Sequence, residues 1–183
     1  MKVLILGGVR SGKSRYAEKL ARTLDGAITV IATGTAGDAE MAARIAAHRA
    51  NRPAEWSVIE EPIALGTTLR RVATRNNVVI VDCLTLWLSN LMCHADAALL
   101  DRERAELLDA LPAVSGSLLL VSNEVGCGIT PVNELARRFA DQVGTLHQRL
   151  ATVCDRVVLM VAGLDVLVKN SQLLGSGRQG TEA

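Results

Sequence analysis

The chain is poor in aromatic residues and has no cysteine pair at a metal-binding spacing. Phe, Trp and Tyr together make up 2% of its 183 residues. The core must therefore be aliphatic, and a base-stacking platform for single-stranded nucleic acid is excluded. The four cysteines, Cys83, Cys93, Cys127 and Cys154, form no CxxC pair, which argues against a zinc site or a disulfide framework. We expect buried free thiols in a reducing cytosol.

A strong net charge and long apolar runs are also absent. The formal net charge is +1, which argues against a protein that binds nucleic acid through a large basic surface. No stretch reaches the roughly 18 uninterrupted apolar residues of a membrane span. The apolar run at the start, Val3 to Leu6, is shorter than the core of a signal peptide. We expect a soluble, cytoplasmic protein with no nucleic-acid partner and no stable membrane insertion.

Short aliphatic runs alternate with longer helical patterns along the chain. Each run is followed by a turn-forming or polar residue, as buried strands are. The predicted strands are 2–6, 27–32, 78–82, 117–122 and 156–162, and 55–62 is compatible with a short strand or a turn. The predicted helices are 13–24, 38–51, 62–75, 84–93, 96–111 and 133–153. The alternation predicts a single α/β domain over 1–169, with helices on both faces of a mainly parallel sheet. The remaining segment, 170–183, loses this pattern, and we expect a flexible tail or an arm that contacts a neighbouring subunit.

The segment GGVRSGKS, residues 7–14, matches the phosphate-binding pattern G-x-x-x-x-G-K-[ST] in full. It follows a predicted strand and opens a predicted helix, which is the context that this motif requires. Gly7, Gly8 and Gly12 allow the backbone to wrap closely, so that its N–H groups point at phosphate oxygens. Lys13 then reaches the β- and γ-phosphates, and the Ser14 hydroxyl is placed to ligate Mg²⁺.

A carboxylate suited to the second magnesium position follows another predicted strand. The run VVIVDC, residues 78–83, ends its apolar part in Asp82. An alternative role for Asp82 is to cap the helix that begins near Leu84. The phosphate loop and Asp82 imply a nucleoside triphosphate with Mg²⁺. They leave open a kinase, an NTPase motor, a GTPase switch or a nucleotidyltransferase, although the size argues against a motor and no guanine-selecting [NT]KxD run is present.

The segment RIAAHRANRP, residues 44–53, surrounds one of only three histidines with basic residues. In a helix over 38–51, Arg44 and His48 lie on one face, and Arg52 continues that line, while Met41 and Ile45 lie with the alanines on the opposite, buried face. One interpretation is a solvated basic helix face. The other is a phosphate clamp, because arginines bind phosphates through two hydrogen bonds and a neutral imidazole can attack phosphorus. Because the attacking nitrogen must be unprotonated, such an attack should fail when the pH drops well below the ordinary histidine pKa of roughly 6.5.

Four segments together resemble the bifunctional adenosylcobinamide kinase / adenosylcobinamide-phosphate guanylyltransferase family of cobalamin biosynthesis. They are GGVRSGKSRYAE, MAARIAAHRANRPAEW, VDCLTLWLSNL and VSNEVGCGITPVNELARRFADQVGTLHQRLA, and the resemblance runs from residue 1 to about residue 169. It implies a RecA-like P-loop fold and a homotrimer. It also implies two reactions: ATP or GTP phosphorylates adenosylcobinamide, and GMP from GTP then passes through an enzyme histidine to adenosylcobinamide phosphate. The products of the second reaction are adenosylcobinamide-GDP and pyrophosphate.

The resemblance also assigns roles to individual residues. The family's R-I-x-x-H-x-x-x-R-P motif falls on 44–53, so the resemblance implies that His48 carries GMP, beside Lys13 and Asp82 as the other catalytic residues. Ser14 and Asp82 are the implied metal ligands. The implied nucleotide-binding residues are Gly7, Gly8, Val9, Arg10, Ser11, Gly12, Lys13, Ser14, Ala32, Thr33, Gly34, Arg49, Ala50, Asn51, Arg52, Glu60 and Asp82.

Some alternatives stay open on the sequence alone. Glu60 is either a nucleotide ligand or an exposed loop acid paired with a basic neighbour. Asn123 and Glu124 either contact substrate or magnesium or shape the turn before the helix at 133. Asp165 stands where family members usually have proline, in the run AGLD. For the whole protein, a kinase without the covalent step and a regulatory nucleotide-binding module are the competing hypotheses.

Overall fold

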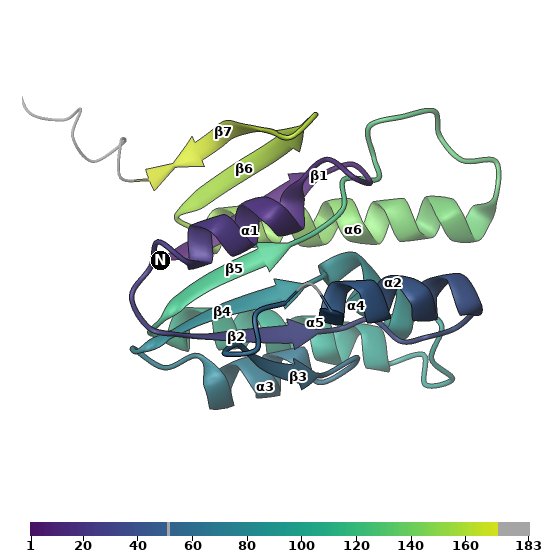
Figure 1. The fold of residues 1–183 in the computed structure, drawn as a ribbon. Coiled ribbons are helices and arrows are strands. Elements are labelled where there is room, and N and C mark those ends of the chain that lie inside the picture. The colour runs from purple at the N-terminus through teal and green to yellow at the C-terminus, as the bar shows by residue number, and fades with distance from the viewer. Residues whose placement is uncertain (51, 172–183) are drawn as a thin grey trace, which may run out of the picture.

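The computed structural model describes residues 1–50 and 52–171, apart from the side chains of Arg44 and His48. Strands and helices alternate along the chain (Figure 1). The strands are β1 (Lys2–Gly7), β2 (Ala27–Ala32), β3 (Ser57–Glu60), β4 (Asn77–Asp82), β5 (Ser117–Val121), β6 (Arg156–Val161) and β7 (Leu164–Asn170). The helices are α1 (Lys13–Ala21), α2 (Ala39–Ala50), α3 (Leu65–Val72), α4 (Leu84–Met92), α5 (Leu99–Ala110) and α6 (Glu134–Val153), with a short 3-10 turn at Leu111–Ala113. The five strands and six helices predicted from the sequence are confirmed.

The strands form a seven-stranded sheet in the order β3-β2-β4-β5-β1-β6-β7. Neighbouring strands are parallel except for β6 and β7, which pair in antiparallel fashion. A two-residue turn, Ala162 and Gly163, joins these two strands with φ angles of 51° and 84°. Positive φ at both positions is typical of a tight hairpin turn that matches the twist of its strands. The segment 55–62, for which the sequence left a short strand or a turn open, contains β3, whereas β7 was not predicted.

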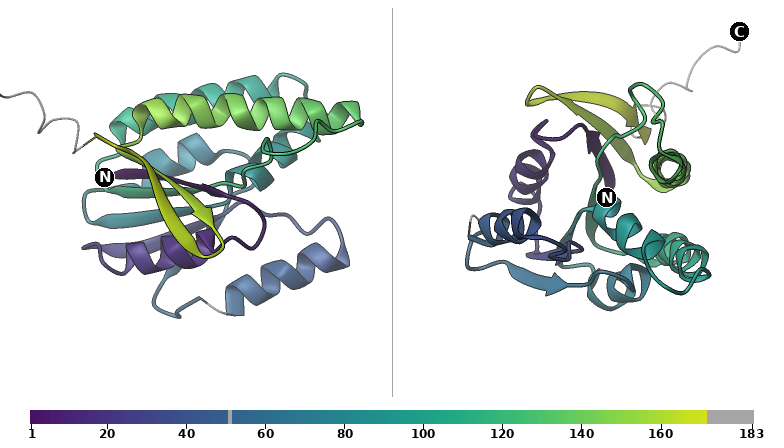
Figure 2. Two further views of the ribbon diagram at one scale, coloured as in Figure 1. Left: turned by 90° about the horizontal axis from the view of Figure 1, so that it is seen from above. Right: turned by 90° about the vertical axis from the view of Figure 1, so that its right-hand side faces the viewer.

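Helices cover both faces of the sheet, and this explains why its central strands are apolar throughout. Val3 and Ile5 of β1 pack with Ala17 and Ala21 of α1 on one face. Leu4 lies on the other face, in a core that α3, α4, α5 and α6 complete. Figure 2 shows α1 and the longer helical layer on opposite sides of the strands. The α/β class with a mainly parallel sheet is therefore confirmed.

Helix α2 is an exception, because it projects beyond the carboxyl ends of the strands (Figures 1 and 2). None of its described side chains is buried. The expected buried face of Met41, Ile45 and the alanines is therefore wrong: the first two are half-buried, and the alanines are exposed. The physical reason is that α2 borders an open cleft, which Met41 and Ile45 line, and does not pack on the sheet.

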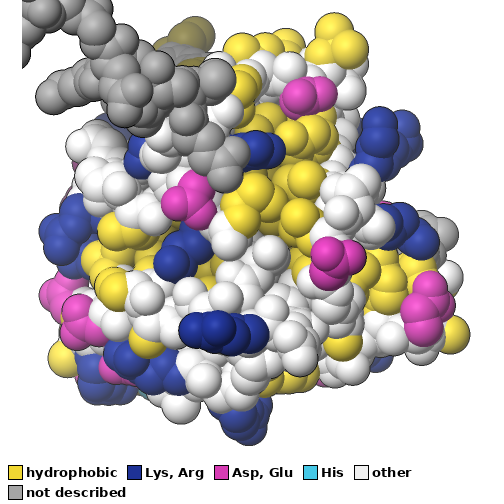
Figure 3. Space-filling view, turned by 90° about the vertical axis from the view of Figure 1, so that its left-hand side faces the viewer, with side chains coloured by type: hydrophobic (Ala, Val, Ile, Leu, Met, Phe, Trp, Pro, Cys, Tyr) yellow, Lys and Arg dark blue, Asp and Glu magenta, His cyan; other side chains and the backbone are white. Residues whose placement is uncertain are grey.

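The surface retains exposed apolar side chains in two segments. Strand β7 exposes Leu164, Val166, Leu167 and Val168, and the segment between β5 and α6 exposes Ile129 among others. Figure 3 shows hydrophobic side chains gathered in a broad area of the face at the amino ends of the strands. Within the described residues, no helix is long and apolar enough to cross a membrane. The expectation of buried thiols is correct for Cys83 and Cys154 and wrong for Cys93 and Cys127, which are exposed near the end of α4 and in the segment before α6.

Candidate active site

The turn between β1 and α1 forms the phosphate loop that the sequence predicts. Gly7 and Gly12 have positive φ angles of 150° and 100°, which favour glycine. A Cβ atom on Gly7 would lie 2.6 Å from the Met160 carbonyl oxygen. The Lys13 ammonium donates to the Gly8 carbonyl oxygen at 2.6 Å, and burial lowers the pKa of Lys13. The ammonium group that binds the β- and γ-phosphates in this motif therefore lies on the concave side of the loop.

The turn of the β6–β7 hairpin supports the phosphate loop from behind. The Gly163 N–H donates to the Ser11 carbonyl oxygen at 3.0 Å. A Cβ atom on Gly12 would lie 3.3 Å from the Gly163 Cα atom, so loop and turn are in close backbone contact. Asp165, at the position where the resembling family usually has proline, lies in β7 opposite Met160. The hairpin turn is therefore formed with this residue present.

Asp82 ends β4 and binds an arginine from the segment that follows α2. Arg52 Nη2 lies 3.1 Å from Asp82 Oδ2, and the Arg52 side chain is only 8% exposed. Helix α4 begins at Leu84 with Cys83 at its N-cap position and no side-chain cap, so Asp82 is not the cap of this helix. Arg52 turns inward and does not continue the exposed face of α2, because that helix ends at Ala50.

A second ion pair joins α2 to the sheet. Arg49, in the last turn of α2, pairs with Glu60 at the end of β3. Both side chains are more than half exposed, and an exposed pair of this kind adds at most about 1 kcal/mol to stability. Its importance is geometric, because it places two oppositely charged groups at the rim where α2 meets the strand ends.

These groups line an open cleft with a volume of about 570 Å³, in the range of small-molecule sites. The predicted site residues that line it are Val9, Arg10, Ser11, Gly12, Lys13, Ser14, Ala32, Gly34, Arg49, Arg52, Glu60 and Asp82. The predicted residues Gly7, Gly8, Thr33 and Ala50 are not among the described lining residues. The backbone of residue 48 belongs to α2, but the His48 side chain and the whole of Asn51 lie outside the described part of the chain.

Several lining residues were not proposed from the sequence, namely Arg15, Met41, Ile45, Ala47, Cys83, Leu86 and Val121. For Arg15 and Cys83 a signal existed, because each directly follows a predicted metal ligand. Leu86 and Val121 gave none, since apolar residues in a helix and a strand are typical of a core. Asn123, which the sequence left undecided, also lines the cleft.

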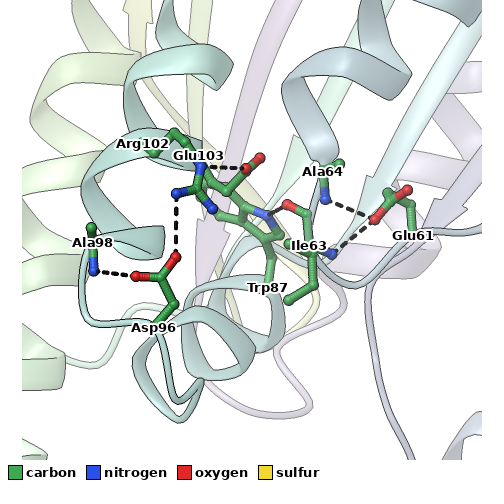
Figure 4. Close-up of polar contacts among 8 residues, drawn as sticks. All are labelled: Glu61, Ile63, Ala64, Trp87, Asp96, Ala98, Arg102 and Glu103. Atoms are coloured by element: carbon green, nitrogen blue, oxygen red, sulfur yellow. Dashed lines mark hydrogen bonds and ion pairs between the residues drawn. The ribbon is translucent and has the colours of Figure 1, made fainter.

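Helix α4 holds the loops that follow β2 and β3. Trp87 Nε1 donates to the Ile63 carbonyl oxygen at 2.7 Å (Figure 4). Asn90 Nδ2 donates to one carbonyl oxygen after β2 and one after β3, at 2.7 and 3.1 Å. The Glu61 carboxylate accepts from the N–H groups of Ile63 and Ala64 at the start of α3 (Figure 4). This network fixes the ends of both strands at the rim of the cleft.

Ser14 and Asp82 give the cleft a hydroxyl and a carboxylate oxygen. Such oxygen ligands suit Mg²⁺, which proteins commonly bind through one or two side chains together with substrate phosphates. No group of three or more His, Cys, Asp and Glu side chains that could hold a metal occurs among the described residues. The side chains present therefore fit an ion shared with a bound triphosphate better than a cage made by the protein alone.

Comparison with known proteins gives one consistent match over the chain. A family model described as cobinamide kinase / cobinamide phosphate guanyltransferase matches residues 3–168. The bifunctional adenosylcobalamin biosynthesis protein CobP of Pseudomonas aeruginosa is 52% identical over 173 residues, which cover 94% of this chain and 100% of that protein. The bifunctional adenosylcobalamin biosynthesis protein CobU of Salmonella typhimurium is 37% identical over 182 residues, which cover 92% of this chain and 100% of that protein.

Two solved structures with a similar fold are an ATPase and an ATP synthase subunit. An ATPase of the type III secretion system of pathogenic bacteria has a TM-score of 0.50 and 13% identity, over 91% of this chain and 56% of that one. The ATP synthase subunit NeqB of Nanoarcheaum equitans has a TM-score of 0.50 and 16% identity, over 86% of this chain and 46% of that one. The chain spans about half the length of these structures, and at such identities the likeness concerns the fold alone.

Proposed function

The chain belongs to the cobinamide kinase / cobinamide phosphate guanyltransferase family, and we propose that both of its reactions use the cleft at the carboxyl ends of the sheet. It is a bifunctional enzyme of adenosylcobalamin biosynthesis. The observation that carries the proposal is the convergence on one cleft of the phosphate loop, Asp82 and the basic segment after α2. A kinase alone needs the first two, whereas the basic segment adds positive charge for a second type of transfer.

The first reaction is phosphorylation of adenosylcobinamide by ATP or GTP. The phosphate-loop N–H groups and Lys13 bind the β- and γ-phosphates, because Lys13 exchanges its bond to the Gly8 carbonyl for bonds to phosphate oxygens. Ser14 and Asp82 would hold Mg²⁺, which neutralises charge on the phosphates when bound. The γ-phosphoryl group passes to the substrate hydroxyl, and the nucleoside diphosphate leaves.

The second reaction is guanylyl transfer in two displacements. A neutral ring nitrogen of His48 forms a bond to the α-phosphorus of GTP, while the bond to the bridging oxygen breaks and pyrophosphate leaves. A phosphate oxygen of adenosylcobinamide phosphate then attacks the same phosphorus, and the N–P bond breaks to give adenosylcobinamide-GDP. Two features support this role: residue 48 belongs to the helix that borders the cleft, and the nearby Arg49 and Arg52 line it. The two guanidinium groups stabilise the charge of the phosphates during the displacement.

We further propose that the enzyme acts as a homotrimer in the cytoplasm, where ATP and GTP are supplied. The exposed apolar side chains of the edge strand β7 support a subunit contact, because such strands are usually covered in the assembled protein. The division into a catalytic domain over 1–169 and a flexible tail over 170–183 stays a prediction. Strand β7 extends to Asn170, and 172–183 lie outside the described residues.

The test is covalent labelling. The protein is incubated with [α-³²P]GTP and Mg²⁺ and then denatured, and we expect label that is acid-labile and stable in base. His48→Ala should lose the label. His94→Ala, a change at an exposed histidine that is not part of the proposed site, is the matched control and should keep it. The absence of label under all conditions would contradict the guanylyl-enzyme step.

Phosphorylation of adenosylcobinamide by ATP distinguishes the competing hypotheses. Lys13→Ala should abolish phosphorylation in every case that involves chemistry at the phosphate loop. If the chain were a kinase without the covalent step, the wild-type protein would phosphorylate adenosylcobinamide without forming label or adenosylcobinamide-GDP, and His48→Ala would leave overall turnover largely intact. A regulatory module would consume little or no nucleotide in the presence of cobinamide.

A further inference from the structure

Asn123 occupies the strand end between the phosphate loop and the proposed metal ligand. Strand β5 lies between β4, which ends at Asp82, and β1, which ends at Gly7. Asn123 follows β5 by two residues, and its two neighbours are bonded to β1: the Ser122 N–H donates to the Ile5 carbonyl and the Glu124 N–H to the Gly7 carbonyl, at 3.0 and 2.9 Å. The backbone at Asn123 is therefore fixed against the base of the phosphate loop.

The Asn123 side chain is held in one orientation and lines the cleft. Its Nδ2 atom donates to the Thr85 hydroxyl at 3.1 Å. Thr85 is buried in the first turn of α4, and its Oγ1 atom also lies 3.1 Å from Cys83 Sγ. The Asn123 Oδ1 atom has no hydrogen-bond partner among the described residues. The carboxamide thus offers the cleft one acceptor and one further N–H.

The residue before Asn123 is anchored by helix α6. The Ser122 hydroxyl and His147 Nε2, in α6, lie 2.7 Å apart, and both side chains are buried. Burial lowers the pKa of His147, partly opposed by the Glu124 carboxylate. A neutral imidazole in this place keeps the end of β5 fixed without adding charge near the phosphates. Rigid support of this kind is what a substrate-positioning group needs.

We propose that Asn123 positions the substrate hydroxyl for phosphoryl transfer and takes no part in guanylylation of the enzyme. The inference rests on the proposed function of the cleft. Its Oδ1 atom accepts a hydrogen bond from the attacking hydroxyl of adenosylcobinamide, and the free N–H donates to a γ-phosphate oxygen. The hydroxyl oxygen then bonds to the γ-phosphorus, the bond from that phosphorus to the β–γ bridging oxygen breaks, and the hydroxyl proton leaves to solvent. A carboxamide does not accept that proton, so its contribution is orientation.

The location of Asn123 explains why only one of the two reactions should depend on it. It lies beside the phosphate loop, which binds the β- and γ-phosphates, and reaches the cleft from β5. Helix α2 and residue 48 reach the cleft from the side of β2 and β3, where Arg49 pairs with Glu60. The group proposed for attack at the γ-phosphorus and the groups proposed for attack at the α-phosphorus therefore reach the cleft from different strands of the same sheet.

The test measures two reactions, phosphorylation of adenosylcobinamide and guanylylation of the enzyme, in Asn123→Ala and Asn123→Asp. With ATP and adenosylcobinamide, we expect kcat for phosphorylation to fall about a hundredfold because the hydroxyl is misplaced, with KM for ATP changed less than about threefold. Labelling of the enzyme by [α-³²P]GTP should stay within about threefold of wild type. Thr85→Val, which removes the hydroxyl that orients the carboxamide, should give a smaller fall in the same kcat. Asn76→Ala, at an exposed asparagine near the opposite ends of the strands, should change neither reaction.

Two results would overturn the inference: an unchanged kcat for phosphorylation in Asn123→Ala, or a parallel loss of phosphorylation and labelling in a variant that unfolds at the wild-type temperature. A failure of the proposed covalent step is distinguishable, since the wild-type protein itself would then form no label. In that case the split between kcat and KM for ATP decides the role of Asn123 by itself.

Discussion

Gly66 and Gly144 are helical glycines for which the same substitution should have opposite effects on stability. Gly66 lies in the first turn of α3, where a Cβ atom would come within 2.6 Å of the Glu106 carbonyl carbon and 2.7 Å of its oxygen. Gly144 lies within α6, and a Cβ atom there would meet nothing within 4 Å. Helix propensity alone favours alanine over glycine at both positions, by at most about 1 kcal/mol.

For Gly66→Ala, the packing cost should exceed the gain in propensity. Non-bonded carbon atoms prefer a separation of about 3.5–4.0 Å, so α3 and α5 would have to move apart by about 1 Å. The obstructing atoms belong to backbone, which has no other rotamer to adopt. Overpacking of this kind costs about 1–3 kcal/mol, which leaves a net loss of about 1 kcal/mol. For Gly144→Ala, we expect a gain of about 0.5–1 kcal/mol.

Thermal and urea unfolding of the two variants measure these signs directly. In a chain of this size, 1 kcal/mol shifts Tm by about 2–4 °C, so Gly66→Ala should melt below wild type and Gly144→Ala above it. Both variants should retain phosphorylation of adenosylcobinamide, because neither glycine lines the cleft among the described residues. An increase in Tm for Gly66→Ala would refute the packing argument, since only propensity would then remain.

Three further outcomes follow from contacts in the structure. Because burial lowers the pKa of His147, the unfolded chain binds its proton more readily, and stability should fall as pH drops below about 6.5; urea unfolding at several pH values should show a weaker dependence in His147→Gln. Lys169 donates to the carbonyls of Ala151 and Cys154 at 2.7 and 2.8 Å, so Lys169→Met should cost about 2 kcal/mol in urea unfolding. Arg52→Lys should weaken GTP binding about tenfold in calorimetric titration, because an ammonium cannot replace a planar guanidinium.

The sequence predicted those parts of the fold and site that depend on local pattern. The strands and the phosphate loop were found because short aliphatic runs and the spacing of Gly7, Gly12 and Lys13 carry their own signal. The buried face of α2 was wrongly predicted, because an apolar stripe does not reveal whether it meets a sheet or borders a cleft. Strand β7 was missed because the prediction relied on strands that alternate with helices, whereas β7 follows β6 directly after a two-residue turn.

The contacts that complete the site could not be predicted from the sequence, for a different reason. The bond between Arg52 and Asp82 joins residues 30 positions apart, and the bond between Asn123 and Thr85 joins residues 38 positions apart. Such pairs are set by the order of strands in the sheet, which local periodicity does not specify. Sequence reasoning could name the chemical groups at the strand ends, but not which of them would be partners.

The contact between the β6–β7 turn and the phosphate loop affects whether a truncated gene product can be expected to bind nucleotide. A premature stop codon after α6 would leave every residue of the phosphate-binding motif in the translated chain. It would also remove β6, the neighbour of β1, and the Gly163 N–H that bonds to Ser11. An intact motif in a truncated reading frame is therefore not sufficient evidence of nucleotide binding, because part of the support of the loop comes from a residue some 150 positions downstream of it.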